Sequence, residues 1–372
     1  MPYERWARVE IDLDAVRRNV RTLKGRTKPG TLFMAVVKAD GYGHGALPVA
    51  RAALAAGADR LGVATVEEGI ALREAGVTAP LQLMSEPPAS AVDLLIEHDL
   101  VPTVTTRAFA GALGRAGAAL GVEIPYHLKV DTGMNRIGVP AAEAHEFAAA
   151  FDSFPGLRLE GTFTHFATAD VLGDWDFETQ LDRFTSALAR MRDEGIGPGI
   201  VHASNSPAMI LHPEAHFDMV RCGIAIYGLH PSRDTYGEVD LAPAMSVVAR
   251  VTLVKKVGMG EGVSYGLTWR AVAPTTIATL PLGYGDGVHR VLSNNMEVLI
   301  GGVRCAQVGR VCMDQLMVEV PRGVTVHEGD EALLVGTQGT ESVLLDELAE
   351  RAGTINYELA CAFGMRMLRA YR

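Results

Sequence analysis

The stretch Leu32-Phe33-Met34-Ala35-Val36-Val37-Lys38-Ala39-Asp40-Gly41-Tyr42-Gly43-His44-Gly45 places a lysine between a continuous apolar run and a glycine-rich turn. An uninterrupted apolar run of this length predicts a strand buried on both faces, as in a parallel sheet. The glycines predict that the backbone then turns away from the strand. A partly desolvated lysine at such a strand end is a potential nucleophile, because loss of hydration disfavours its charged form. Taken alone, Lys38 is more simply explained as a surface lysine whose stem covers apolar atoms.

Apolar runs alternate with alanine-rich, helix-like segments from about residue 30 to residue 230. Eight strands, each followed by a helix, predict a (β/α)₈ barrel. Helical periodicity is present at residues 47–56 and 177–194, and residues 10–21 are expected to form an amphipathic helix after a short strand. The expected barrel strands are residues 32–38, 61–66, 81–85, 101–105, 124–131, 159–165, 200–204 and 217–221.

The sequence pattern changes after residue 240. From there on, short strand-like runs follow one another with glycine-rich turns between them. The expected strands are residues 247–257, 275–280, 296–300, 304–312, 315–320 and 331–335, followed by a helix at 344–351. The predicted fold class is α/β, an N-terminal (β/α)₈ TIM-type barrel at residues 1–240 followed by a mostly β C-terminal domain at residues 241–372. The first residues, about ten of them, are expected to pair with the second domain.

Composition and charge narrow the possible partners of the chain. The 372 residues carry 44 acidic against 34 basic side chains, a net charge of −10, which argues against nucleic acid as a ligand. No apolar run approaches the roughly 18 residues that cross a membrane, and the N-terminus lacks the apolar core of a signal peptide. A cytoplasmic protein with reduced thiols is expected, because the four cysteines are widely spaced and form no Cys-x-x-Cys pair.

Polar residues gather where the expected barrel strands end, which is where barrels of this type carry their chemistry. These residues are Lys38, Lys129, Asp131, Arg136, His165, Ser204, Asn205 and Arg221. The loops after the seventh and eighth strands commonly bind phosphate, and here Ser204 offers a hydroxyl while Gly223 allows close approach of backbone N–H groups. A lysine on the first strand facing a phosphate loop suggests a phosphorylated aldehyde held as an imine, which is pyridoxal phosphate.

In combination these motifs resemble those of the alanine racemase family. The segments that carry the resemblance are residues 37–45, 129–138, 202–207, 221–228, 263–266, 283–287, 309–314 and 356–358. They cover essentially the whole chain in order. The resemblance implies a fold-type III pyridoxal-phosphate enzyme that works as a homodimer with shared active sites. It also implies interconversion of L- and D-alanine through an external aldimine, which supplies D-alanine for peptidoglycan.

The resemblance assigns two acid–base groups. Lys38 carries the cofactor as an aldimine and serves one face of the substrate, and Tyr265 of the partner chain serves the other. Removing a proton from one face and returning it to the other needs two positioned groups, so this division agrees with the chemistry. Arg136 is implied both as the cationic neighbour that Tyr265 needs and as the group that holds the substrate carboxylate.

Arg221 is implied as the partner of the pyridine nitrogen. An arginine can only donate to that nitrogen and leaves it neutral, whereas a carboxylate would keep it protonated. The ring is then a weaker electron sink, and transamination is suppressed. His165 is expected to orient Arg221, although a buried histidine with a purely structural role fits that position nearly as well.

The remaining roles also come from the resemblance. Met313 and Asp314 are implied at the substrate carboxylate, and Tyr284 at the entrance. Lys129 is implied as an N-carboxylated lysine that pairs with Arg136, with a plain Lys129–Asp131 pair as the alternative. The implied cofactor-binding residues are Lys38, Tyr42, His165, Ser204, Asn205, Arg221, Gly223, Ile224 and Tyr357.

Other functions remain open at this point. A decarboxylase of the same fold would place an acid at the pyridine nitrogen, against Arg221, although Cys312 leaves a catalytic cysteine possible. A broad-specificity racemase and a non-catalytic carrier of the cofactor are further alternatives. A metal hydrolase could use His127, Lys129, His165 and His202 at the strand ends, but it would need a His-x-His on the first strand, where this chain has Lys38. We therefore expect no metal site.

Overall fold

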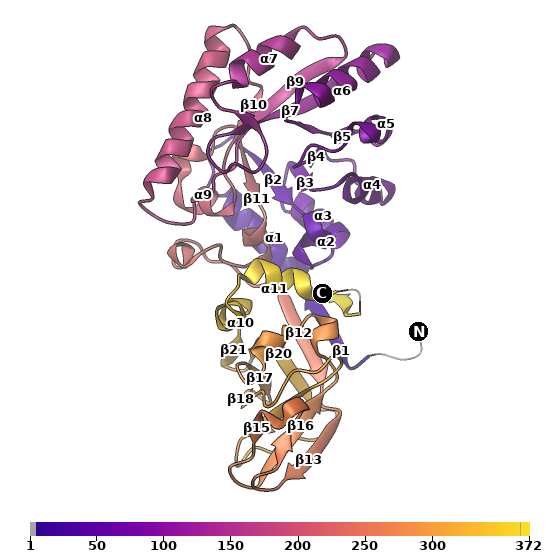
Figure 1. Cartoon of the computed structure of the whole chain (residues 1–372), viewed down its shortest axis with the longest axis vertical. Coiled ribbons are helices and arrows are strands. Elements are labelled where there is room, and N and C mark those ends of the chain that lie inside the picture. Colours follow the sequence, from indigo (N-terminus) through magenta and orange to yellow (C-terminus); the bar gives the residue numbers. More distant parts are fainter. Residues whose placement is uncertain (1–4, 365) are drawn as a thin grey trace. The chain divides into compact units, whose positions relative to one another are not determined.

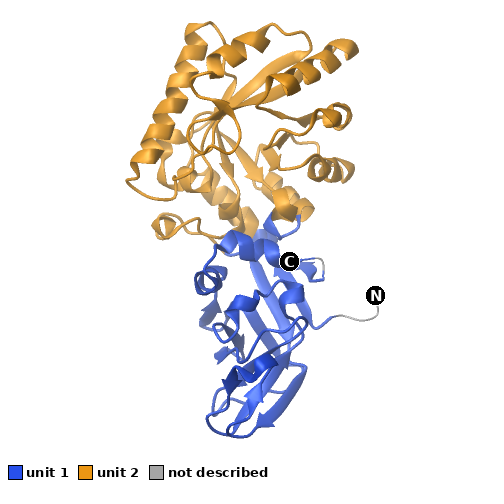
Figure 2. Ribbon diagram, viewed as in Figure 1, with its two compact units in different colours: residues 1–14, 42–45, 243–372 blue, residues 15–41, 46–242 orange. Residues whose placement is uncertain are grey.

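The computed structural model describes residues 5–364 and 366–372 of the chain (Figure 1). The chain divides into two compact units (Figure 2). Unit 1 comprises Met1–Asp14, Tyr42–Gly45 and Pro243–Arg372, and unit 2 comprises Ala15–Gly41 and Ala46–Ala242. Among the described residues, none of the helices combines the length and the apolar character needed to span a bilayer.

Unit 2 contains two runs of parallel strands, in the orders β11-β2-β3-β4-β5 and β10-β9-β7-β6. The strands are β2 (Leu32–Val36), β3 (Arg60–Val63), β4 (Leu81–Leu83), β5 (Leu100–Val101), β6 (Thr103–Val104), β7 (Ile124–Asp131), β9 (Leu157–Phe163), β10 (Ile200–His202) and β11 (Met219–Cys222). A two-residue strand, β8 (Val139–Pro140), pairs with the end of β7. Buried apolar side chains such as Phe33, Leu61, Leu128 and Val220 fill the unit.

The two runs join into a closed ring. β5 and β6 form one expected strand interrupted at Pro102, whose carbonyl accepts from the His127 N–H at 3.0 Å. On the other side, the Asp218 N–H donates to Val201 O and the Arg221 N–H donates to Ser204 O, both at 3.0 Å, which bridges β11 to β10. The predicted (β/α)₈ barrel is therefore confirmed.

Helices lie on the outside of these strands in Figure 1. Their starts are set by side-chain caps. In α4, Thr65 and Glu68 form a reciprocal capping box, and in α6 the Thr106 side chain accepts from the Phe109 N–H. The helices are α1 (Leu13–Lys24), α3 (Ala46–Ala55), α4 (Val66–Glu74), α5 (Val92–Glu97), α6 (Arg107–Leu120), α7 (Ala144–Asp152), α8 (Trp175–Asp193) and α9 (Ser206–Leu211).

Unit 1 is built on a seven-stranded sheet in the order β18-β17-β20-β12-β1-β22, with β21 paired to β20. A three-stranded sheet, β13-β16-β19, and the pair β14-β15 complete it, together with two helices. The elements are β1 (Ala7–Ile11), β12 (Met245–Arg250), β13 (Leu253–Val257), β14 (Gly262–Val263), β15 (Trp269–Arg270), β16 (Thr275–Leu280), β17 (Glu297–Ile300), β18 (Val303–Ala306), β19 (Leu316–Val320), β20 (Glu331–Gln338), β21 (Glu341–Val343), α10 (Leu345–Ala352), α11 (Asn356–Ala362) and β22 (Leu368–Tyr371).

Three expected elements differ from the structure. The expected strand at residues 247–257 is two strands, because the backbone leaves one sheet after Val251, whose N–H donates to Asp330 O, and joins another at Thr252, whose N–H donates to Thr279 O. The expected strand at 304–312 ends at Ala306, and Gly309 beyond it has φ 76°. The helix expected at residues 10–21 begins at Leu13, since Glu10 belongs to β1.

Candidate functional site

The backbone after β2 forms a left-handed turn that begins directly behind Lys38. Ala39, Asp40, Gly41 and Tyr42 have φ values of 52°, 51°, 60° and 52°. Left-handed backbone costs a residue with a side chain roughly 1–2 kcal/mol, so consecutive residues in this region need strong local support. Strain of this kind is typical of functional sites, where the surrounding structure holds it in place.

That support comes from Glu68 and Asp40. The Glu68 carboxylate accepts from the Ala39 N–H at 2.6 Å and from the Ala64 N–H at 2.8 Å, while the same side chain closes the capping box of α4. The Asp40 carboxylate accepts from the Ala46 N–H at 2.9 Å. Glu68 therefore connects the start of α4 to the turn that follows Lys38.

Arg221, on β11 beside β2, is 2% exposed and has neutral hydrogen-bond acceptors. Its Nη1 lies 3.1 Å from His202 Nδ1, and its Nη2 donates to the carbonyls of Thr164 at 2.8 Å and Ala203 at 3.0 Å. Burial lowers the pKa of Arg221 to about 9, which leaves the guanidinium protonated at neutral pH. A buried cation with neutral acceptors favours an anionic or electron-rich ligand.

His165 lies where the sequence predicts it, with Nδ1 at 3.3 Å from Arg221 Nη2. Burial, and then the Arg221 charge, hold the pKa of His165 well below its usual value, so the imidazole is neutral. His202 makes the shorter contact with the guanidinium, at 3.1 Å. The sequence pattern does not predict the contact between His202 and Arg221, because it joins residues on neighbouring strands.

Lys129 is buried on β7 near the ring of Phe163, with Nζ 5.4 Å from the ring centroid. Burial lowers the pKa of Lys129 to about 7, assisted by the charges of Arg136, Arg221 and Lys38 and opposed by Asp131. Asp131 Oδ1 accepts from the N–H groups of Gly133 and Asn135, which shapes the loop that carries Arg136. The end of the barrel thus collects positive charge.

The hydroxyl groups of the predicted Ser204 and of Ser206 are engaged in different ways. The Ser204 hydroxyl is buried and donates to Ala215 O at 2.7 Å, so its proton is engaged within the fold. Ser206 Oγ instead accepts from the Gly223 N–H at 3.0 Å, which leaves its own O–H to donate. Asn205 caps α9 by accepting from the Ala208 N–H. Two serines two positions apart cannot be ranked from sequence, because either could open the helix.

The segment η3 (Ile224–Tyr227) is tied to the end of β2. The Tyr227 hydroxyl donates to Val36 O at 2.9 Å, two residues before Lys38. Gly223 follows Cys222, the last residue of β11, which pairs with Ala35 of β2. The η3 segment therefore lies beside the end of β2, the strand that leads to Lys38.

The other predicted residues lie in unit 1. Tyr265 is 71% exposed and follows Ser264, which has φ 65° and donates its hydroxyl to Arg310 O at 2.6 Å. Met313 is 52% exposed, and its carbonyl accepts from the Gly285 N–H at 2.9 Å. Asp314 pairs with Arg366 at 2.6 Å.

The remaining unit 1 tyrosines show two different environments. The rings of Tyr42 and Tyr357 lie 6.1 Å apart at an angle of 54°. The exposed Tyr284 is held by its N–H, which donates to Cys312 O at 2.9 Å. The 312–313 backbone thereby fixes both Tyr284 and Gly285.

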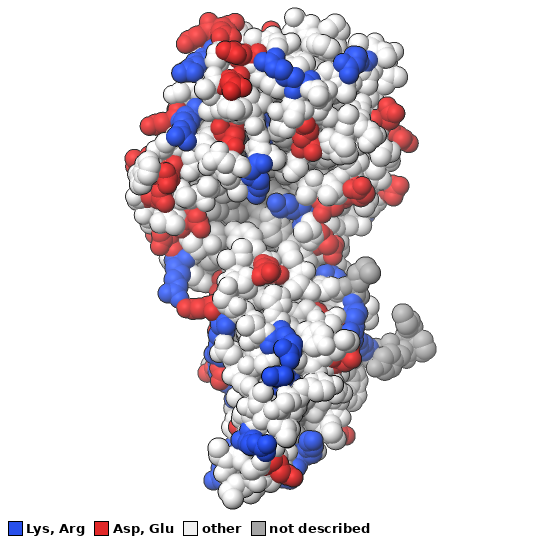
Figure 3. Space-filling model, in the orientation of Figure 1, with Lys and Arg blue, Asp and Glu red and all other residues white. Residues whose placement is uncertain are grey.

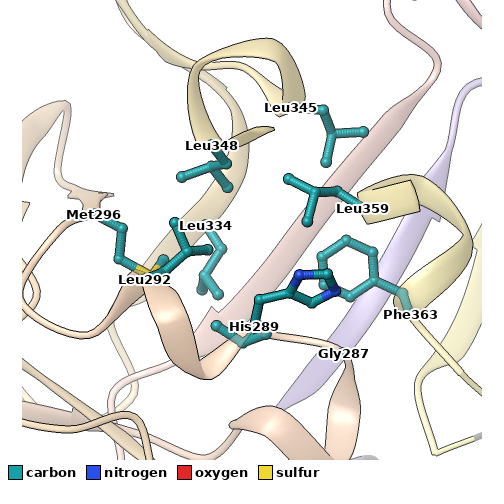
Figure 4. A pocket seen from close by; sticks show the side chains of 10 residues that line it. Gly287, His289, Leu292, Met296, Leu334, Leu345, Leu348, Leu359 and Phe363 are labelled. Carbon is teal, nitrogen blue, oxygen red and sulfur yellow. The ribbon is translucent and has the colours of Figure 1, made fainter. Parts of the chain in front are cut away.

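Two cavities described for the chain contain none of the predicted site residues. A cavity of about 10 Å³ inside unit 1 is lined mainly by leucines together with His289, Met296 and Phe363 (Figure 4). A groove of about 360 Å³ lies between α8 and the two alanines Ala141 and Ala142 that precede α7, and it includes Arg183 and Arg190. Neither gathers groups suited to catalysis.

Charges are interspersed over the face drawn in Figure 3, where blue and red side chains alternate. Within the described part of the chain, no three His, Cys, Asp or Glu side chains are grouped to hold a metal ion.

Comparison with known proteins places both units in one family. Residues 11–231 match the family profile described as alanine racemase, N-terminal domain, and residues 244–371 match that of the alanine racemase C-terminal domain. A protein named alanine racemase from Symbiobacterium thermophilum is 47% identical over 366 residues, which cover 98% of this chain and 96% of the relative. A second, from Desulfovibrio desulfuricans, is 44% identical over 98% of this chain and 97% of its own length.

Solved structures agree with the sequence comparison. The alanine racemase of Bacillus anthracis with bound L-Ala-P has a TM-score of 0.94 and 38% identity, over 100% of this chain and 96% of that one. The alanine racemase of E. faecalis has the same TM-score with 40% identity, over 99% of this chain and 98% of its own. The chain therefore belongs to the alanine racemase family.

Proposed function

We propose that this chain is a pyridoxal-phosphate-dependent enzyme that interconverts L-alanine and D-alanine. The observation that carries the proposal is that β2, the strand leading to Lys38, pairs with β11, where the buried Arg221 has neutral acceptors. Relatives named alanine racemase align with 98% of the chain, which supports the same activity.

The residues fit this cofactor. Lys38 would bind its aldehyde, Arg221 would donate to the pyridine nitrogen, and Ser206 with the Gly223–Ile224 loop would hold the phosphate. The charges of Arg136, Arg221 and Lys38 all act on Lys129, and this concentration of positive charge suits anions, which a phosphate and a substrate carboxylate supply. His165, Asn205, Tyr42 and Tyr357 complete the proposed set, on the strength of the family resemblance.

The bound cofactor supplies an electron-withdrawing group that makes the α-proton of the amino acid acidic. Lys38 and Tyr265 take and return that proton on opposite faces, so that neither group has to move around the substrate. Arg136 holds the substrate carboxylate, with the Met313 N–H and Asp314 beside it. Tyr265, Met313 and Asp314 come from the partner subunit of a homodimer in this proposal, and their exposure in the single chain suits that role.

Arg221 favours a racemase over a decarboxylase or a transaminase of the same fold. A decarboxylase or a transaminase benefits from a carboxylate at the pyridine nitrogen, because a protonated ring takes up more charge. The described contacts of Arg221 bring carbonyls and imidazoles to the guanidinium instead. In this proposal the enzyme is cytoplasmic, and the D-alanine that it forms is used for the synthesis of peptidoglycan.

A chiral assay tests the activity. The purified protein with added pyridoxal phosphate should convert L-alanine to D-alanine, and borohydride should fix the cofactor to the peptide that contains Lys38. Lys38→Ala should abolish both results, whereas Lys24→Ala, at an ion pair with Asp59, should preserve them. A protein that neither retains the cofactor nor forms D-alanine would refute the proposal.

A further inference from the structure

Two buried histidines connect Arg221 to a distant ion pair in the barrel, Arg60–Glu160. Arg221 Nη1 lies 3.1 Å from His202 Nδ1, His202 Nε2 lies 2.7 Å from His127 Nδ1, and His127 Nε2 lies 3.0 Å from Glu160 Oε2. Glu160 in turn accepts from both Nη atoms of Arg60, at 2.9 and 3.2 Å. His127 and His202 are both fully buried, so this series of contacts has no competing solvent.

The chemistry of the two ends fixes every proton between them. Arg221 can only donate, so His202 Nδ1 must accept and the proton of that ring lies on Nε2. His202 Nε2 then donates to His127 Nδ1, which places the His127 proton on Nε2, facing Glu160. An ionised carboxylate can only accept, and it completes the series.

Electrostatics holds this state at neutral pH. Burial lowers the pKa of both His127 and His202, so neither ring takes a second proton. The hydrogen bond from His127, together with Arg60, lowers the pKa of Glu160 to about 2. The carboxylate is therefore present wherever the enzyme works.

The strands are shaped to make these contacts. The pairing of β7 with β9 shifts between Tyr126 and His127, so that Glu160 is passed over and Gly161 pairs with His127. A Cβ on Gly161 would lie 2.5 Å from Cε1 of the His127 ring, so a glycine is needed there. Phe163 stacks on His202 with ring centroids 4.7 Å apart. Gly161 therefore leaves room for the His127 ring, and Phe163 fixes the orientation of the His202 ring.

We propose that Glu160 is a positioning residue for Arg221, acting through the two histidines. Its carboxylate sets the direction of all three hydrogen bonds and so keeps His202 Nδ1 free to accept from the guanidinium. With the opposite direction, His202 would present an N–H to an N–H of Arg221, and the guanidinium would lose the acceptor at Nη1 while keeping the two carbonyls at Nη2. The inference deepens the proposed function and rests on it for the role of Arg221, but the proton positions do not depend on it.

The first measurement uses the wild-type protein without added cofactor. Labelling with ¹⁵N-histidine and recording nitrogen NMR at pH 7 identifies the protonated nitrogen of each ring, with signals assigned by His127→Gln and His202→Gln. Both rings should be neutral with the proton on Nε2. A proton on Nδ1 of either ring, or a charged ring, would overturn the inference whether or not the protein proves to be a racemase.

The second measurement reverses the direction of the hydrogen bonds through the two histidines while retaining an ion pair at positions 60 and 160. In the double variant Arg60→Glu/Glu160→Lys, the lysine donates to His127, and the series must run the other way. We expect kcat to fall about 10- to 100-fold, the effect of losing a hydrogen bond to a charged group. The ¹⁵N signal of the ring nitrogen of labelled pyridoxal phosphate should shift as well. Glu160→Gln, whose amide oxygen can still accept, should stay within about threefold of wild type.

Asp59→Asn is the matched control, because Asp59 is also a partly buried carboxylate with one cationic partner, Lys24. It should leave the cofactor signal and kcat unchanged. The inference would be refuted by a double variant with wild-type kcat and cofactor signal, or by a Glu160→Gln variant as impaired as the double variant. Either result would show that the direction of the hydrogen bonds does not position Arg221. A protein that binds no cofactor would instead refute the proposed function, and the histidine measurement would remain decisive.

Discussion

Lys129 has an amine whose pKa departs far from that of a lysine in water. Burial lowers the pKa of its amine to about 7, with the charges of Arg136, Arg221 and Lys38 acting in the same direction. An ordinary lysine has a pKa of about 10.4 and is almost fully protonated at pH 8. Lys129 is largely neutral there, and a neutral amine adds carbon dioxide to form a carbamate with release of a proton.

We predict that Lys129 is carboxylated in bicarbonate and that the carbamate grows as pH rises from 6 to 8, because the neutral amine is the reactive form. The neighbouring cations stabilise the resulting anion. Carbon NMR with ¹³C-bicarbonate measures the carbamate directly, and Lys129→Met serves as the control. A signal that persists in Lys129→Met, or no signal at pH 8, contradicts the prediction.

At the residue level, the sequence indicates which side chains end the strands but not which atoms they engage. Lys38 and Arg221 could be located because a charged residue after an apolar run is conspicuous. Ser206 could not be distinguished from Ser204, since the choice depends on the Ala215 carbonyl. The link from Arg221 through His202 and His127 to Glu160 depends on a shift in strand pairing that no local pattern reveals.

At the level of elements, the left-handed turn behind Lys38 depends on Glu68. We predict that Glu68→Ala destabilises the fold by about 1–3 kcal/mol, because it removes the α4 cap and the acceptor of the Ala39 N–H together. Denaturant unfolding measures the change, and cofactor retention should fall with it. Glu74→Ala, exposed at the end of the same helix, should change stability by less than about 0.5 kcal/mol. Equal effects of the two substitutions would show that the turn does not need Glu68.

Strand prediction succeeded in the barrel and was less accurate in unit 1, for a physical reason. A barrel strand buried on both faces has a long apolar signature, and β7 matches its expected bounds of residues 124–131. In unit 1, consecutive strands belong to different sheets, and the change between β12 and β13 depends on partners distant in sequence, Asp330 and Thr279. The short β14, β15 and β21, and the terminal α11 and β22, lacked a pattern long enough to detect.

For the whole molecule, the proposed sharing of active sites between subunits predicts complementation. Lys38→Ala and Tyr265→Ala homodimers should both be nearly inactive. Refolding an equal mixture makes about half of the dimers mixed, each with one intact site, so activity should recover to roughly a quarter of wild type. Each variant refolded alone is the control. Mixed dimers that stay inactive would show that both residues act within one chain.

The pairing of β1 with β22 also bears on how the protein is made. β1 precedes the barrel strands in the chain and β22 follows them, yet β1 and β22 are parallel neighbours in one sheet, with Arg8 opposite Leu368. On the ribosome, the barrel sequence is complete long before this sheet can be, so domains folding in order of synthesis would form the barrel first. Until then β1 has an open edge, which is a template for unwanted pairing. The β1–β22 pair can therefore form only after the whole barrel segment has been synthesised.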